Sequence, residues 1–229
     1  EKRSSLVRLL NDHSFFCFDT ETTGLDANNC ELVGLSFSVK QGEAWYVPLP
    51  EDQNECKTIL TEFKSVLENP LISKIGQNIK YDILVLKWYD VNIQGELFDT
   101  MLAHYLIDPD SRHNMDLLAE NYLNYSPVSI STLIGDKGKN QGNMRDADIE
   151  KVKEYAAEDA DITLQLKTVF EPILKSVNAW KLAEDIENPL IYVLADIERE
   201  GVKIDQEALV EFSKTLETDI RAFEKTIYE

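Results

Sequence analysis

The sequence has 229 residues, of which 43% are hydrophobic and 28% charged, and its formal net charge is −19. This composition is typical of a globular chain with a buried core, and no run approaches the roughly 18 apolar residues of a membrane-spanning helix. Three cysteines without C-x-x-C spacing argue against a disulfide framework or a zinc site and suit a reducing cytoplasm. The acidity argues against tight, autonomous binding of duplex DNA, although a small site in which Mg²⁺ reverses the local charge stays possible.

The first half of the sequence predicts strands followed by alternating helices and strands. Compact apolar runs separated by turn residues predict a three-stranded meander over Phe15–Asp19, Glu31–Val39 and Ala44–Pro48. The next expected elements are a helix over 55–67, a strand over 71–76, a helix over 79–88, a strand over 96–98 and a helix from Thr100 with Asp99 as its N-cap. This order predicts an α/β domain with helices packed on a mixed sheet.

The second half is expected to be mostly helical. Its elements are a helix over 114–123, a polar loop with short helical turns over 126–143, and a long helix over 148–174 that ends or bends near Pro172. Two acidic helical stretches follow, over 180–199 and 205–228. We therefore expect one domain over residues 1–177 and the truncated helical start of another over 178–229. The sequence does not begin with Met, so we expect it to be an excised piece of a longer protein.

Two carboxylates directly follow the first apolar run. Asp19 and Glu21 are two residues apart, so on a strand their side chains point to the same face. Neighbouring carboxylates repel each other unless they share a cation, and Mg²⁺ and Mn²⁺ prefer oxygen ligands. For an isolated pair of this kind, a solvated strand edge is the simpler explanation. The pair by itself therefore predicts only half of a metal site.

Two further pairs have the spacing of one helical turn. Asn78 and Asp82 share a face of the expected helix 79–88, although Asn78 alone is also explained as a helix cap. Tyr155 and Asp159 share one stripe of the long helix, beside its apolar face. A phenol and a carboxylate in this arrangement can orient a water molecule and bind a metal, whereas a solvated acidic face is the simpler alternative.

Taken together, the three pairs resemble the DEDD exonucleases in their tyrosine-bearing form. Over residues 10–175 the chain resembles the 3′-5′ proofreading domain of bacterial family-A DNA polymerases, the DNA polymerase I family. The resemblance is carried by the segments GQNIKYD, FDTMLAHYLI, SRHNMDLLAE, KGKNQ and YAAEDADITLQL. The tail NPLIYVLADIEREGVKID is similar to the start of the polymerase thumb.

The resemblance implies a ribonuclease H-like exonuclease fold and two divalent metal ions, Mg²⁺ or Mn²⁺. Asp19, Glu21 and Asp159 would hold one ion, and Asp19 with a water-mediated Asp82 would hold the other. Tyr155 and Glu21 would orient the attacking water. The residues implied to contact the substrate strand are Leu25, Gln77, Asn78, Tyr81, Arg112, Met115 and Met144, the last of which stands where some relatives have an aromatic wedge.

The resemblance also implies partners and a location. The partners are a single-stranded DNA 3′ end and the polymerase domain of the same parent chain, and the location is the bacterial cytosol, at the nucleoid. Without palm or fingers motifs, the chain itself is not expected to extend a primer.

Two other functions stay open. A ribonuclease D-like RNA exonuclease shares the tyrosine-type constellation, and the polymerase-like flanking segments argue for DNA instead. A catalytically inactive domain kept as a structural spacer is the second alternative, against which stand all four carboxylates and Tyr155. A histidine-type nuclease is disfavoured because position 155 is Tyr.

Overall fold

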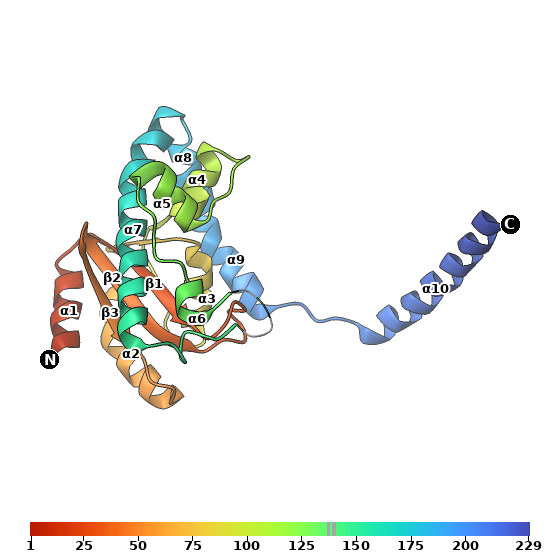
Figure 1. Cartoon of the computed structure of the whole chain (residues 1–229), viewed down its shortest axis with the longest axis horizontal. Coiled ribbons are helices and arrows are strands. Elements are labelled where there is room, and N and C mark those ends of the chain that lie inside the picture. The colour runs from red at the N-terminus through yellow and green to blue at the C-terminus, as the bar shows by residue number, and fades with distance from the viewer. Residues whose placement is uncertain (137, 139–140) are drawn as a thin grey trace. The chain divides into compact units, whose positions relative to one another are not determined.

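The structure, a computed structural model, describes residues 1–136, 138 and 141–229 (Figure 1). The chain divides into two compact units, Glu1–Arg199 and Glu200–Glu229. The second unit contains one helix, α10 (Gln206–Tyr228), which begins where the Asp205 side chain accepts a hydrogen bond from the Ala208 N–H. The domain boundary expected at residue 178 stays a prediction. Among the described residues, no helix is both long and apolar enough to cross a membrane.

The first unit is built on a five-stranded sheet with the strand order β3-β2-β1-β4-β5. The strands are β1 (Phe15–Thr22), β2 (Leu32–Lys40), β3 (Glu43–Pro48), β4 (Ser73–Gly76) and β5 (Leu97–Asp99). The pairs β1–β2 and β2–β3 are antiparallel, whereas β1–β4 and β4–β5 are parallel. The predicted meander and the predicted mixed sheet are therefore confirmed.

Helices surround this sheet. In the first unit they are α1 (Lys2–Asn11), α2 (Gln53–Leu67), α3 (Ile79–Lys87), α4 (Thr100–Ile107), α5 (Met115–Leu123), α6 (Ser131–Ile134), α7 (Ile149–Ser176), α8 (Trp180–Leu182), the π-helix η1 (Ala183–Glu187) and α9 (Asn188–Glu200, whose last residue is assigned to the second unit). The sequence analysis did not predict α1 or η1. The alternative that the long helix ends near Pro172 is wrong, because α7 continues to Ser176. Phe170 and Leu174 are fully buried on either side of the proline, and their packing offsets the lost backbone hydrogen bond.

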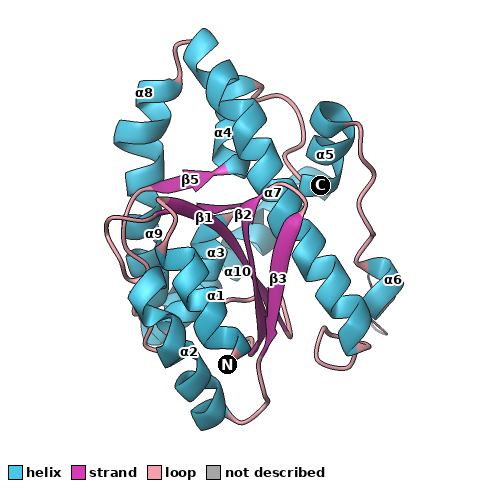
Figure 2. Ribbon diagram, turned by 90° about the vertical axis from the view of Figure 1, so that its left-hand side faces the viewer, coloured by secondary structure: helices cyan, strands magenta, loops and turns pink. Residues whose placement is uncertain are grey.

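The two faces of the sheet bury different cores, because side chains alternate along each strand. Phe16 and Phe18 of β1 pack in a core with residues of α1, α2 and α3, whereas Cys17 packs in a core with residues of α4, α5 and α7. Figure 2 shows helices on both sides of the sheet. Asp19 and Glu21 continue the Cys17 register, so they lie on the face that α7 covers.

One buried carboxylate begins two helices. Asp99, 3% exposed, accepts hydrogen bonds from Met101 N–H (2.8 Å) and Leu102 N–H (3.2 Å) at the start of α4, which confirms it as the predicted N-cap. It also accepts from Asn78 N–H (3.2 Å) and Ile79 N–H (2.8 Å) at the start of α3. Asn78 itself makes no side-chain capping bond and has a left-handed backbone, φ 57°. The cap interpretation of Asn78 is therefore wrong, because Asp99 takes that role.

This double cap makes a stability prediction. Asp99→Ala leaves four backbone N–H groups without their acceptor, so the free energy of unfolding is expected to fall by about 2–4 kcal/mol. Urea denaturation measures the change. Asp148→Ala is the matched control, because Asp148 caps α7 alone and its loss is expected to cost about 1 kcal/mol. Equal losses in the two variants would contradict the double role of Asp99.

Candidate active site

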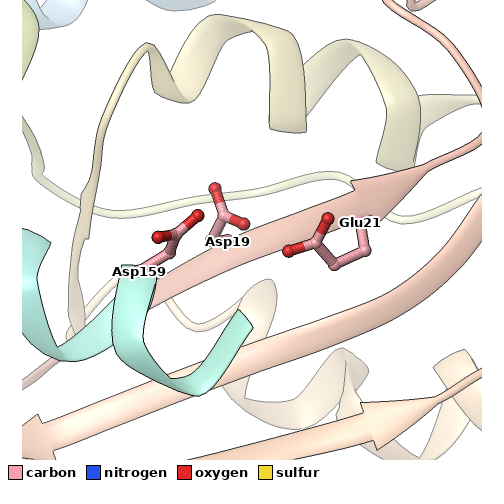
Figure 3. A group of neighbouring side chains, drawn as sticks. All are labelled: Asp19, Glu21 and Asp159. Carbon is pink, nitrogen blue, oxygen red and sulfur yellow. The ribbon is translucent and has the colours of Figure 1, made fainter. Parts of the chain in front are cut away.

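Three carboxylates meet on the α7 face of the sheet. Asp19 and Glu21 project from β1, and Asp159 reaches them from α7 (Figure 3). One oxygen atom of each carboxylate lies within 4.8 Å of the others. The strand spacing brings the first pair together, as the sequence predicted, and the packing of α7 across β1 adds the third member, as the resemblance implied.

Asp82 lies at the edge of β1 that β4 leaves unpaired. The last pair of the β1–β4 register is Cys17 with Ile75, so beyond it this edge of β1 has no neighbouring strand. Asp82, on the first turn of α3, takes the vacant position: its Oδ1 accepts from Thr20 N–H at 3.0 Å and from Thr20 Oγ1 at 2.5 Å. Asp82 is therefore fixed beside Asp19 but lies outside the group of three carboxylates.

Burial of these carboxylates raises their pKa values. Desolvation raises the pKa of Asp19 to about 7. It also raises the pKa values of Glu21, Asp82 and Asp159 well above their usual range, and for each of them the charge of Asp19 is the next cause. The four groups repel one another in a region of low polarity, and this arrangement requires either protons or a cation.

The site fits a hard divalent cation. Oε1 of Glu21 and Oδ1 of Asp159 are buried and have no hydrogen-bond partner among the described residues. A buried oxygen without a partner is costly unless something binds it. None of the described residues that line the adjoining cavity is Lys, Arg or His. Clustered carboxylate oxygens without a basic side chain are the donor set that Mg²⁺ and Mn²⁺ prefer.

Tyr155 stands one helical turn before Asp159 on α7. It packs in a small cluster with Val33, Met144 and Val152. Burial, and then the negative charge of Asp159, raise the pKa of the Tyr155 hydroxyl far above its ordinary value. The phenol therefore keeps its proton at neutral pH. It can hold a water molecule by hydrogen bonding but cannot act as a base.

A cavity of about 540 Å³ opens over the acidic group. Its lining includes Asp19, Glu21, Asp82, Tyr155 and Asp159 together with Leu25, Gln77, Asn78, Tyr81 and Met144 from the predicted substrate set. Gly138 and Gln141 of the KGKNQ segment also line it, whereas residues 137, 139 and 140 of that segment lie outside the described residues. The structure thus brings the predicted catalytic residues and most of the predicted substrate residues to one cavity.

Three predicted substrate residues have positions that the sequence did not suggest. Arg112 is exposed and Met115 accepts a hydrogen bond from Thr163 Oγ1 at 3.3 Å, and the structure places neither in the cavity wall. Met144 lines the cavity but is only 3% exposed, because it packs in the cluster with Tyr155. Contacts of all three with a substrate strand stay predictions.

The resemblance implied a contact of Tyr81 with the substrate DNA strand and gave no sign of the contacts that Tyr81 makes within the protein. Its hydroxyl donates to the Gly24 carbonyl at 2.6 Å and lies 2.6 Å from Thr22 Oγ1. These bonds fix the loop that presents Leu25, whose side chain is 93% exposed at the cavity. The contacts depend on how α3 packs beside β1, and no spacing in the sequence encodes that packing.

Gly34 and Tyr46 were also missed. Gly34 pairs with Glu21 across β1 and β2, and a Cβ there would lie 2.2 Å from Tyr46 Oη. The Tyr46 ring therefore covers Gly34, and it packs in the same cluster as Tyr155. The floor of the site beneath Glu21 requires glycine at position 34, because any larger residue displaces that ring.

A mixed sheet with an acidic group beneath a cavity describes an α/β protein with a candidate site for a divalent cation. Residues 1–175 match the family model described as 3′-5′ exonuclease, a domain of A-type DNA polymerases. The chain belongs to this 3′-5′ exonuclease family. It is similar to DNA polymerase I of Pseudomonas aeruginosa, with 38% identity over 97% of this chain and 25% of the relative. The chain spans about a quarter of the length of the curated relatives it matches.

Solved structures agree on the fold. The polymerase domain of Pol1 from M. smegmatis, in complex with DNA primer-template and dNTP, has a TM-score of 0.79 at 19% identity and covers 100% of this chain and 36% of that one. Escherichia coli RNase D, an exoribonuclease, has a TM-score of 0.68 at 15% identity over 87% of this chain and 49% of that one. The predicted ribonuclease H-like exonuclease fold is confirmed.

Proposed function

We propose that this domain removes 5′-mononucleotides from single-stranded or frayed DNA 3′ ends, as the proofreading part of a DNA polymerase I used in replication and repair. The observation that carries the proposal is the group of Asp19, Glu21 and Asp159, with carboxylate oxygens within 4.8 Å of one another beneath the cavity. The proposed partner is the polymerase domain of the same parent chain, and the proposed location is the bacterial cytosol, at the nucleoid.

Two divalent ions, Mg²⁺ or Mn²⁺, are part of the proposal. Asp19, Glu21 and Asp159 would hold one, and Asp19 with a water-mediated Asp82 the other. When bound, such a pair supplies the charge that activates a water and offsets the charge of an in-line displacement at phosphorus. The hydrogen bonds from Thr20 keep Asp82 in place beside Asp19.

The protein groups would orient the reactants. Tyr155, which keeps its proton, donates a hydrogen bond to the attacking water, and the Glu21 carboxylate accepts one from it. The water oxygen bonds to the terminal phosphorus as the bond from phosphorus to the 3′ oxygen of the preceding nucleotide breaks. The products are a 5′-mononucleotide and a strand one nucleotide shorter.

Substrate selection would follow from access to the cavity. A terminal base must leave its duplex partner to enter, and mismatched ends cost less to melt than paired ends. The net charge of −19 gives the chain little affinity for duplex DNA, so we propose that the polymerase domain delivers the 3′ end. Nanomolar binding of duplex DNA by this chain in physiological salt would contradict that delivery role.

The test compares DNA with RNA. Mononucleotide release is measured on single-stranded DNA and RNA of one sequence, with Mg²⁺ and with Asp19→Ala as the inactive control. We expect DNA to be degraded about 10-fold faster, because a site shaped for DNA does not accommodate the 2′-hydroxyl groups of RNA. Faster degradation of RNA would replace the proofreading proposal with the ribonuclease D-like alternative.

A further inference from the structure

A buried histidine lies behind the wall of the catalytic cavity. His104 of α4 is 3% exposed, and both of its ring nitrogens have neighbours. Its Nδ1 lies 2.7 Å from Nδ1 of His113, and its Nε2 lies 3.1 Å from the hydroxyl of Tyr122 on α5. The ring also packs against Phe170 of α7, with centroids 5.6 Å apart. A polar ring this buried and this fully bonded holds one orientation.

The contact with His113 leads to the cavity. The backbone carbonyl of His113 accepts a hydrogen bond from Nε2 of Gln77 at 2.8 Å. Oε1 of the same Gln77 accepts from the hydroxyl of Thr100, so both ends of the amide are fixed. Gln77 lines the catalytic cavity beside Asp19 and Asp82. A continuous chain of contacts therefore runs from His104 through His113 to a residue of the cavity wall.

The short distance between the two histidines requires one proton between them. Burial, and then the neighbouring His113, lower the pKa of His104, which favours its neutral form. One of the two Nδ1 atoms carries the proton and the other accepts it, so the hydrogen bond couples the two rings in either tautomer. The backbone of residues 108–114 belongs to no helix or strand, so side-chain contacts of this kind must fix it.

We infer that His104 is a positioning residue for substrate binding: through its hydrogen bond with His113, it holds the His113 carbonyl where the Gln77 amide is aligned at the cavity. The inference rests on the proposed function, because it assigns the pair to the binding of the DNA 3′ end. His104 does not touch the acidic group, so its effect belongs to binding and not to the chemical step.

The first experiment separates KM from kcat. His104→Phe keeps the ring volume and removes the ring nitrogen that bonds to His113. With a single-stranded DNA oligonucleotide we expect KM to rise about 3- to 10-fold and kcat to stay within about 2-fold. His104→Asn places an amide acceptor near the Nδ1 position and is expected to restore most of the affinity. Tyr122→Phe removes only the other bond of His104 and is expected to leave both constants unchanged.

A double-mutant cycle tests whether His104 acts through Gln77. Gln77→Ala is expected to raise KM by itself, and adding His104→Phe to it is expected to change KM no further. Additive effects, or an unchanged KM in folded His104→Phe, would overturn the inference. If His104→Phe does not fold, His113→Ala removes the other partner of this hydrogen bond instead and enters the same cycle. Absence of activity in the wild-type chain would contradict the proposed function. An active enzyme whose KM does not change in His104→Phe would contradict only the role of His104.

Discussion

An Asp19→Asn variant is expected to keep its fold and to lose about 10³-fold or more of its Mg²⁺-dependent release of mononucleotides. Asp19 is the carboxylate that both proposed metal positions share, and its charge acts on Glu21, Asp82 and Asp159 alike. Asparagine keeps the size of the side chain and removes the charge. The loss is measured as initial rates on a 3′-labelled single-stranded DNA at saturating Mg²⁺.

Asp161→Asn is the matched control on α7. Asp161 lies two residues beyond Asp159, but it accepts hydrogen bonds from Gly42 N–H (2.7 Å) and from Gln165 (2.8 Å) instead of facing the cavity. Its amide replacement is expected to retain activity within about 2-fold, as for a substitution away from a functional site. Full activity in Asp19→Asn would place the chemistry elsewhere. An inactive wild-type chain would support the structural-spacer alternative.

The residues of the candidate site were predictable because they lie at spacings that secondary structure converts directly into proximity. Asp19 and Glu21 needed only the alternation of a strand, and Tyr155 and Asp159 needed only one turn of a helix. The proximity of these two pairs was predicted from the resemblance to known exonucleases, because the sequence spacing does not indicate that Asp159 lies near Asp19. The structure confirms that proximity for Asp19, Glu21 and Asp159.

The supporting residues were not predictable, because their roles depend on where elements end relative to one another. Thr20 bonds to Asp82 only because β1 continues beyond the end of β4. Gly34 lies under Tyr46 only because of the register of β2 with β3. Asp99 was recognised as the cap of the helix that follows it, whereas its capping of α3 depends on the parallel pairing of β4 with β5.

The burial of the carboxylates predicts how stability depends on pH without metal. Folding raises the pKa of Asp19 to about 7, so the folded protein binds this proton more tightly than the unfolded chain does. The stabilisation is complete below the unfolded pKa near 4 and is lost as the pH rises through about 7. In EDTA, the free energy of unfolding is therefore expected to fall by about 2 kcal/mol or more between pH 5 and pH 8.

Saturating Mg²⁺ is expected to reverse this loss. A cation that binds only the folded, deprotonated site stabilises it by about 2–4 kcal/mol at pH 8, whereas at pH 5 protons compete and the gain is smaller. Urea denaturation at both pH values, with EDTA and with Mg²⁺, gives the free energy of unfolding under the four conditions. Equal stabilisation by Mg²⁺ at the two pH values would show that the ion binds away from the buried carboxylates.

Asp19→Asn gives a second check. This variant lacks the charge that acts on the other three carboxylates. It is therefore expected to be more stable than the wild type in EDTA at pH 8 and to gain less stability from Mg²⁺. The residue that the proposed chemistry needs most is thus also one whose charge destabilises the metal-free fold.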